Sequence, residues 1–184
     1  MPTALVLASG RGERFLASGG TTHKLQALLG AKTVLQHTLD AVCASGLPWH
    51  LEDGGHAGMG DSIAAAVRAT PQASGWLVVL GDLPLIQAAT LQALAQALSL
   101  HDVVIPTYQG QRGHPVGFSA RCRESLLNLS GDKGAASVVK IFGGKFGGQF
   151  GGYEIELNDV GIVSDIDTVE DLARLAHLMQ SIKS

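Results

Sequence analysis

Short apolar runs alternate along this chain with longer segments in which apolar residues recur at helical spacing. Residues 3–8 are continuously apolar and stop at Gly10, and residues 76–80 stop in the same way at Gly81. Runs of this kind are typical of strands buried on both faces of a parallel sheet. Residues 33–44 and 87–98 carry apolar side chains three and four positions apart. The alternation therefore predicts an α/β domain with helices on both faces of a mostly parallel sheet.

The same patterns locate the other elements. Further strands are expected at residues 48–51, 103–106 and 116–119, and further helices at residues 61–69 and 168–182. Residues 153–157 and 161–166 are expected to form a closing hairpin. A length of 184 residues suits one domain, so residues 1–184 are predicted to fold as a single unit.

Composition narrows the class of protein. Hydrophobic residues make up 46% of the chain but aromatic residues only 5%, and the formal net charge is −3. No cluster of Lys or Arg stands out in the sequence, so nothing in its charge pattern indicates nucleic-acid binding. The two cysteines have no motif spacing and are interpreted as reduced thiols of a cytoplasmic protein. No segment has the length of a membrane span, and the N-terminal sequence lacks the basic start of a secretory signal.

A glycine-containing loop follows the first predicted strand. Gly10 and Gly12 allow the backbone to turn amide groups toward one point, which favours anion binding. Arg11, Arg14 and Lys24 lie nearby in the sequence, and cations with backbone amides are what a triphosphate requires. A plain turn explains the glycines equally well. The spacing matches neither a Walker A loop nor the dinucleotide pattern G-x-G-x-x-G, since Phe15 stands at the third glycine position.

Acidic residues are expected at the same edge of the sheet. Asp82 follows the strongest predicted strand in W-L-V-V-L-G-D-L-P, where a carboxylate is costly unless a cation or hydrogen bonds meet it. Mg²⁺ held together with substrate phosphates is the simplest such partner. Asp165 and Asp167 form a second acidic pair, but Asp167 or Thr168 could instead cap the last helix.

The ordered set of motifs resembles a known family. The motifs are L-A-S-G-R-G-E-R-F, H-K-L, G-M-G-D-S, L-G-D-L-P-L-I, R-G-H-P-V-G-F, G-D-K-G-A and D-I-D-T-V-E-D-L. Together they resemble the MobA-like nucleotidyltransferases, and among them most closely the molybdenum cofactor cytidylyltransferases. The resemblance implies a Rossmann-like three-layer fold of the nucleotide-diphospho-sugar transferase type. It also implies a transferase that uses Mg²⁺ and a nucleoside triphosphate in molybdenum cofactor biosynthesis.

The resemblance also implies roles for individual residues. Arg14, Lys24 and Asp82 match catalytic positions, and Asp82 and Asp167 match the expected metal ligands. The residues matched to nucleotide or acceptor binding are Ala8, Ser9, Gly10, Gly12, Gly58, Gly60, Ser62, Arg112 and His114. Arg112 could equally be a solvated surface charge, and His114 a polar residue of a turn. Met59 is expected to pack rather than to hold a base.

The implied reaction transfers CMP from CTP to a phosphorylated acceptor such as molybdopterin and releases pyrophosphate. Ser9 stands where guanylyltransferases of the family have glycine and cytidylyltransferases alanine. Alternatives are a guanylyl or sugar-phosphate nucleotidyltransferase, or a nucleotide-binding protein without turnover. No nucleic-acid or membrane partner is expected.

Two segments depart from the family pattern. Residues 47–57 have room for only one short strand and a loop, whereas a parallel crossover needs a dozen or more residues, so the sheet could lack one strand–helix unit. Residues 142–152 read F-G-G-K-F-G-G-Q-F-G-G and are interpreted as a flexible surface loop or as a flap over a ligand.

Overall fold

A computed structural model describes residues 1–146, 149–150 and 152–183. Its central sheet is built from β1 (Thr3–Leu7), β4 (Trp49–Glu52), β5 (Gly75–Leu80), β6 (Val103–Tyr108), β7 (Gln111–Arg112), β8 (Val116–Ser119) and β11 (Tyr153–Glu156). The strand order is β11-β6-β8-β5-β1-β4, with β7 paired to β6. Strands β4, β1 and β5 are mutually parallel, whereas β8 runs antiparallel to β5 and β6. The predicted mostly parallel sheet is confirmed.

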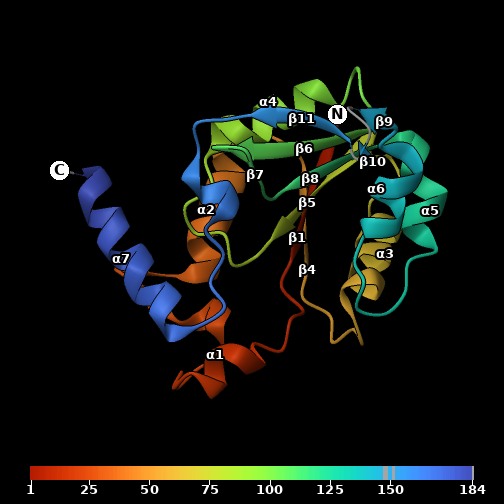
Figure 1. Ribbon diagram of the computed structural model, residues 1–184. Coiled ribbons are helices and arrows are strands. Elements are labelled where there is room, and N and C mark those ends of the chain that lie inside the picture. Colours follow the sequence, from red (N-terminus) through yellow and green to blue (C-terminus); the bar gives the residue numbers. More distant parts are fainter. Residues whose placement is uncertain (147–148, 151, 184) are drawn as a thin grey trace.

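Helices cover both faces of this sheet (Figure 1). The helices are α1 (Glu13–Ala17), α2 (Val34–Ala44), α3 (Met59–Ala69), α4 (Ala88–Ala97), α5 (Arg123–Leu127), α6 (Ala136–Phe142) and α7 (Val169–Lys183). Short 3-10 helices are η1 (Lys24–Gln26), η2 (Ala120–Cys122) and η3 (Val160–Val163), and short strand pairs are β2 (Leu28–Leu29) with β3 (Lys32–Thr33) and β9 (Lys145–Phe146) with β10 (Gln149–Phe150).

Alternation of side chains along β1 produces two cores. Leu5 and Leu7 pack with residues of α3, α5 and α6 on one face of the sheet. Ala4 and Val6 pack with residues of α2 and α4 on the other face. Successive side chains of a strand point to opposite faces, so a continuously apolar run fills both cores at once. The fold is the three-layer α/β arrangement expected from the sequence.

The short segment before α3 forms one strand and a loop, as its length predicts. Residues 47–57 contain one strand, β4, and a loop that leads directly into α3. Within the described part of the chain, β4 is the outermost strand beside β1. From β4 the chain crosses through α3 to β5, which lies on the other side of β1.

The predicted closing hairpin is wrong. Residues 153–156 form β11, which pairs in parallel with β6, and Val160–Val163 form the 3-10 helix η3 instead of a returning strand. The physical reason lies at Asp159, whose carboxylate accepts a hydrogen bond from the Gly161 amide at 2.8 Å and turns the chain. Gly161 then lies so close to the Leu85 carbonyl that a side chain would not fit there.

The glycine-rich run at residues 142–152 lies partly outside the described residues. The described portion comprises the end of α6 and the strands β9 and β10, which pair antiparallel. Whether this run is a loop or a flap stays a prediction. In the described residues no helix is both long enough and apolar enough to cross a membrane.

Candidate active site

An open cavity of about 680 Å³ lies where β1, β4 and β5 end. Its walls come from the loop after β1, the starts of α1 and η1, the residues before and within the first turn of α3, the loop after β5, and residues 132, 165 and 167. The carboxyl ends of parallel strands are the usual ligand-binding edge of such sheets. The sequence predicted this location from the loops after Ala8 and Leu80.

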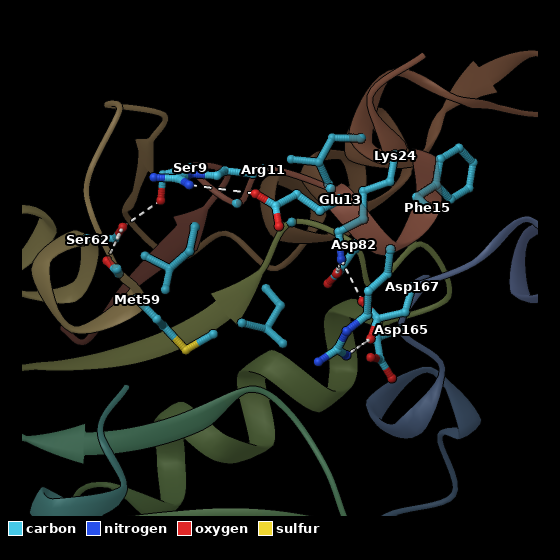
Figure 2. A pocket seen from close by; sticks show the side chains of 18 of the residues that line it. Ser9, Arg11, Glu13, Phe15, Lys24, Met59, Ser62, Asp82, Asp165 and Asp167 are labelled. Carbon is cyan, nitrogen blue, oxygen red and sulfur yellow. Dashed lines mark hydrogen bonds and ion pairs between the residues drawn. The ribbon is translucent and has the colours of Figure 1, made fainter. Parts of the chain in front are cut away.

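One end of the cavity is charged (Figure 2). Lys24 Nζ lies 2.5 Å from Asp82 Oδ2 and 2.9 Å from Asp167 Oδ1, so the ammonium bridges the two carboxylates. Arg14 Nη1 donates to Asp167 Oδ2 at 2.9 Å. Residues separated by up to 153 positions in sequence therefore form one ion cluster.

Burial and charge act in opposite directions on this cluster. Burial lowers the pKa of Lys24, but the Asp82 charge and the hydrogen bonds to both carboxylates outweigh it and raise that pKa above its usual value. The hydrogen bond from Lys24 lowers the pKa of Asp167 despite partial burial. Burial raises the pKa of Asp82, although the Lys24 charge opposes this.

The donor set at this end suits a divalent cation. Asp82 Oδ1 is buried and has no hydrogen-bond partner among the described residues, and a buried carboxylate oxygen without a partner is costly. In the described part of the chain no group of three or more His, Cys, Asp or Glu side chains forms a ready-made metal site. Two carboxylates completed by phosphates and water are a common way to hold Mg²⁺, and Asp82 and Asp167 fit that pattern.

Of the two candidate caps for the last helix, Thr168 takes this role, and a metal-ligand role for Asp167 stays a prediction. Thr168 Oγ1 accepts from the Asp171 amide at 3.2 Å, and Asp171 Oδ2 accepts from the Thr168 amide at 2.9 Å. This reciprocal pair caps the start of α7. Both carboxylate oxygens of Asp167 are directed to Lys24 and Arg14 instead. Asp165 also lines the cavity.

The loop after β1 is shaped by its glycines and by a histidine that sequence reasoning passed over. Gly12 has a φ of 65°, in the left-handed region that favours glycine, and it starts α1. His23 Nδ1 accepts from the Leu25 amide at 3.3 Å, so its Nε2 is the donor to the Gly10 carbonyl at 2.6 Å. This bond ties the loop to the residue next to Lys24.

The opposite end of the cavity has a wall of uncharged side chains, called here the uncharged end, although the charged Arg11 and Asp132 also line the cavity. Ser9 Oγ lies 2.5 Å from Ser62 Oγ, and Met59 lies beside them with its side chain partly exposed (Figure 2). Gly58 and Gly60 pack against the backbone of residues 130 and 131 too closely for any side chain. The G-M-G-D-S motif thus allows the first turn of α3 to approach the loop that carries Asp132, which also lines the cavity.

A second histidine at this end had no signal in the sequence. Glu52 ends β4 beside the glycine loop, since the Ala8 amide donates to its carbonyl at 2.8 Å. Its carboxylate lies 2.9 Å from His56 Nε2, and His56 lines the cavity. Partial burial raises the pKa of Glu52, but hydrogen bonds from His56, Gly54 and His50 lower it below its usual value. Only the folded loop brings Glu52 and His56 together.

Two residues assigned to the acceptor are not among the residues that line the cavity, although His114 is close enough to Asp82 and Asp165 for their charges to act on it. Arg112 in β7 donates through Nε to Glu154 Oε1 at 2.6 Å on the neighbouring strand β11. His114 Nδ1 is buried and has no hydrogen-bond partner in the described residues, and burial lowers the pKa of this imidazole. Their contact with an acceptor stays a prediction. Ala8 and Gly60 shape the site through their backbones rather than by lining it.

Comparison with known proteins agrees with this geometry. A family model described as a MobA-like NTP transferase domain matches residues 41–145, more than half of the chain. The chain belongs to the MobA-like NTP transferase family. The members of this family are nucleotidyltransferases, which take a nucleoside triphosphate and an acceptor as substrates and typically use a divalent metal.

Individual relatives vary in what their names describe. Purine catabolism protein PucB of Bacillus subtilis (strain 168) is 31% identical over 116 residues, which are 62% of this chain and 54% of PucB. The chain thus spans about half the length of that curated relative. The structure of Rv0371c from Mycobacterium tuberculosis H37Rv superposes with a TM-score of 0.73 at 25% identity, covering 95% of this chain and 96% of that one.

More distant structures share the fold. A manganese complex of Rv0371c has a TM-score of 0.70 at 24% identity, covering 95% of this chain and 97% of that one. A nucleotidyl transferase from Methanothermobacter thermautotroptrophicus has a TM-score of 0.75 at 21% identity, covering 98% of this chain and 99% of that one. The nucleotide-diphospho-sugar transferase type of fold is confirmed by such neighbours.

Proposed function

We propose that this protein transfers CMP from CTP to a phosphorylated small-molecule acceptor, such as molybdopterin, with Mg²⁺ and with release of pyrophosphate. The observation that carries the proposal is the ion cluster of Lys24, Asp82 and Asp167. It lies in one cavity with the glycine loop and with the uncharged wall of Ser9, Met59 and Ser62. A nucleoside triphosphate would fit both parts of this cavity, because its polyphosphate is charged and its base is neutral.

The residues of the charged end have distinct tasks in this proposal. Asp82 and Asp167 hold Mg²⁺, which when bound neutralises charge on the phosphates. Lys24 and Arg14, which lie against these carboxylates, turn to the phosphates and stabilise the leaving pyrophosphate. Amides of the loop at Gly10 and Gly12 fix the triphosphate in line with the acceptor. Positioning and charge neutralisation do most of the work in phosphoryl-type transfer.

The whole of residues 1–184 is proposed to act as one nucleotidyltransferase domain. The family match covers residues 41–145, whereas Lys24 lies before this range and Asp167 after it. Both side chains nevertheless contact each other and lie close to Asp82 in one cavity. The catalytic cluster therefore needs both ends of the chain.

Ser9 supports the cytidylyl assignment. Its side chain occupies space at the uncharged end, where the guanylyltransferases of the family have glycine, and its hydroxyl is held against α3 by Ser62. Added bulk at this point disfavours a purine more than a pyrimidine. The preference for CTP over GTP is expected to be about ten- to a hundredfold, the range of one or two lost hydrogen bonds.

The acceptor is the part of the proposal that rests most on resemblance. One relative is named for purine catabolism, and a fold neighbour from Archaeoglobus fulgidus for molybdopterin-guanine dinucleotide biosynthesis. These names favour guanylyl transfer or a different phosphorylated acceptor as the second candidate. Either would use the same ion cluster.

Release of pyrophosphate tests the proposal. The protein is mixed with Mg²⁺, molybdopterin and either CTP or GTP, and pyrophosphate is measured by a coupled assay. We expect release with CTP that depends on both the acceptor and the metal. Faster release with GTP would replace the cytidylyl assignment by a guanylyl one, and no release with any triphosphate would remove molybdopterin as the acceptor.

A further inference from the structure

The hydroxyl of Ser62 is buried and fully engaged. Its side chain is 1% exposed, and its Oγ lies 3.1 Å from the carbonyl oxygen of Gly58 and 2.5 Å from Oγ of Ser9. A carbonyl oxygen can only accept a hydrogen bond, whereas a hydroxyl has one proton to donate. Both contacts are therefore hydrogen bonds only when Ser62 donates to Gly58 and Ser9 donates to Ser62.

This arrangement fixes the proton of Ser9. Because that proton is used on Ser62, Ser9 Oγ has only lone pairs left for anything bound in the cavity that it lines. A serine hydroxyl usually rotates to serve as donor or acceptor. Here the buried partner on α3 makes it an acceptor alone.

The position of the proton on the His56 ring is also fixed, in this case by Glu52. His56 Nε2 lies 2.9 Å from the carboxylate of Glu52, which also accepts from the Gly54 amide at 3.2 Å. A carboxylate only accepts, so Nε2 carries the proton, and in the neutral ring Nδ1 is left as an acceptor. A side chain at position 54 would collide with both groups of this pair.

We propose that the uncharged end of the cavity selects a nucleobase with an exocyclic amine, and that Ser62 and Glu52 act as positioning residues that impose this choice through Ser9 and His56. The inference rests on the proposed function in taking this cavity as the nucleotide site. Cytosine carries an amine where uracil carries a carbonyl oxygen. When uracil is bound, its carbonyl oxygen faces the acceptor atom of Ser9 or His56, and no proton is available for a hydrogen bond between the two atoms.

Calorimetric binding of CTP and of UTP, each with Mg²⁺, tests the proposal. The unaltered protein is expected to bind CTP at least about tenfold more tightly, the equivalent of one lost hydrogen bond. Ser9→Ala narrows the ratio because CTP binds more weakly. Ser62→Ala also reduces the ratio of CTP affinity to UTP affinity, but through tighter binding of UTP. Without Ser62 Oγ, the Ser9 hydroxyl is free to donate its proton to the uracil oxygen.

Tighter binding of UTP by Ser62→Ala distinguishes a positioning role of Ser62 from a merely structural one. General damage from Ser62→Ala would weaken both nucleotides alike, and that result would overturn the proposal. Ser62→Thr retains the hydroxyl and should restore the ratio. Glu52→Gln is a second test. The glutamine amide can donate to His56 Nε2, which moves the ring proton to Nδ1 and again favours UTP. Ser99→Ala, at an exposed serine at the end of α4, is the matched control and should leave the ratio unchanged.

Failure of the inference is distinguishable from failure of the proposed function. Equal affinities for CTP and UTP in the unaltered protein would overturn the inference while the protein still bound CTP. If GTP binds and neither pyrimidine does, the cytidylyl proposal falls, and a comparison of GTP with ITP, which lacks the amine, then decides the inference. GTP should bind about tenfold more tightly, and equal binding would overturn it.

Discussion

Lys24 holds together two carboxylates that are separated by 85 positions in the chain, Asp82 and Asp167. The sequence predicted Asp82 at the site from its position after a strand and Lys24 from its position after the glycine loop, whereas Asp167 was expected there because of the family resemblance. The sequence could not show that the ammonium lies between the carboxylates, because that contact depends on how the ends of β1, β5 and η3 meet.

Replacement of Lys24 by alanine should weaken binding of CTP more than binding of CMP. The lost contact is to the outer phosphates, and a hydrogen bond to a charged group is worth about 1.5–3 kcal/mol, so CTP should lose about tenfold or more. Titration calorimetry with both nucleotides in the presence of Mg²⁺ measures this. Equal losses for CTP and CMP would place Lys24 away from the outer phosphates.

The ion cluster also predicts how stability depends on pH. The pKa of Asp167 is lowered from 3.8, so its stabilising effect is present above pH 3.8 and is lost as pH falls through the folded-state pKa. The pKa of Lys24 is raised from 10.5, so its effect is present below pH 10.5 and is lost as pH rises further. Both charges are in place across the neutral range.

Urea unfolding of the unaltered protein and of Asp167→Asn should therefore differ by a constant amount from about pH 5 to 9. The difference should shrink below about pH 4, where the native carboxylate begins to take up its proton. A gap of the same size at strongly acidic pH would show that the variant acts through packing rather than through the charge.

At the scale of elements, the period of the apolar residues was sufficient for most helices and strands. It failed at residues 153–166 because strands of an edge hairpin and a strand followed by a 3-10 turn have similar local patterns. The deciding contact is long-range. Asp159 Oδ2 accepts from the Gln87 amide at 3.0 Å and from the Thr90 hydroxyl at 2.6 Å at the start of α4.

Replacement of Asp159 by alanine should lower the free energy of unfolding by about 2–4 kcal/mol, since it leaves buried donors without a partner. Chemical denaturation followed by circular dichroism measures the loss. Asp40→Ala is the matched control, because Asp40 pairs with Lys32 in an exposed ion pair that is worth about 0–1 kcal/mol. Similar losses in the two variants would contradict the capping role of Asp159.

At the scale of the whole molecule, the cavity gathers side chains that are distant in sequence. The strand-end rule predicted its location at the loops after Ala8 and Leu80. It gave no sign of His23, Glu52 or His56, because each acts through a hydrogen bond that exists only when separate loops are folded. The separation of the Lys24 ion cluster from the wall of Ser9, Met59 and Ser62 likewise appears only in three dimensions (Figure 2).

Thermal unfolding of the protein with CTP tests whether this cavity binds a triphosphate together with a divalent metal on Asp82. With Mg²⁺ and saturating CTP we expect the Tm to rise by about 5–10 °C, since ligand at about a hundred times its Kd stabilises by about 2.7 kcal/mol. Removal of Mg²⁺ by a chelator should abolish most of the rise. In Asp82→Asn, with native circular dichroism, CTP should have the same small effect with or without Mg²⁺. An equal rise in both proteins, with and without the metal, would contradict the account.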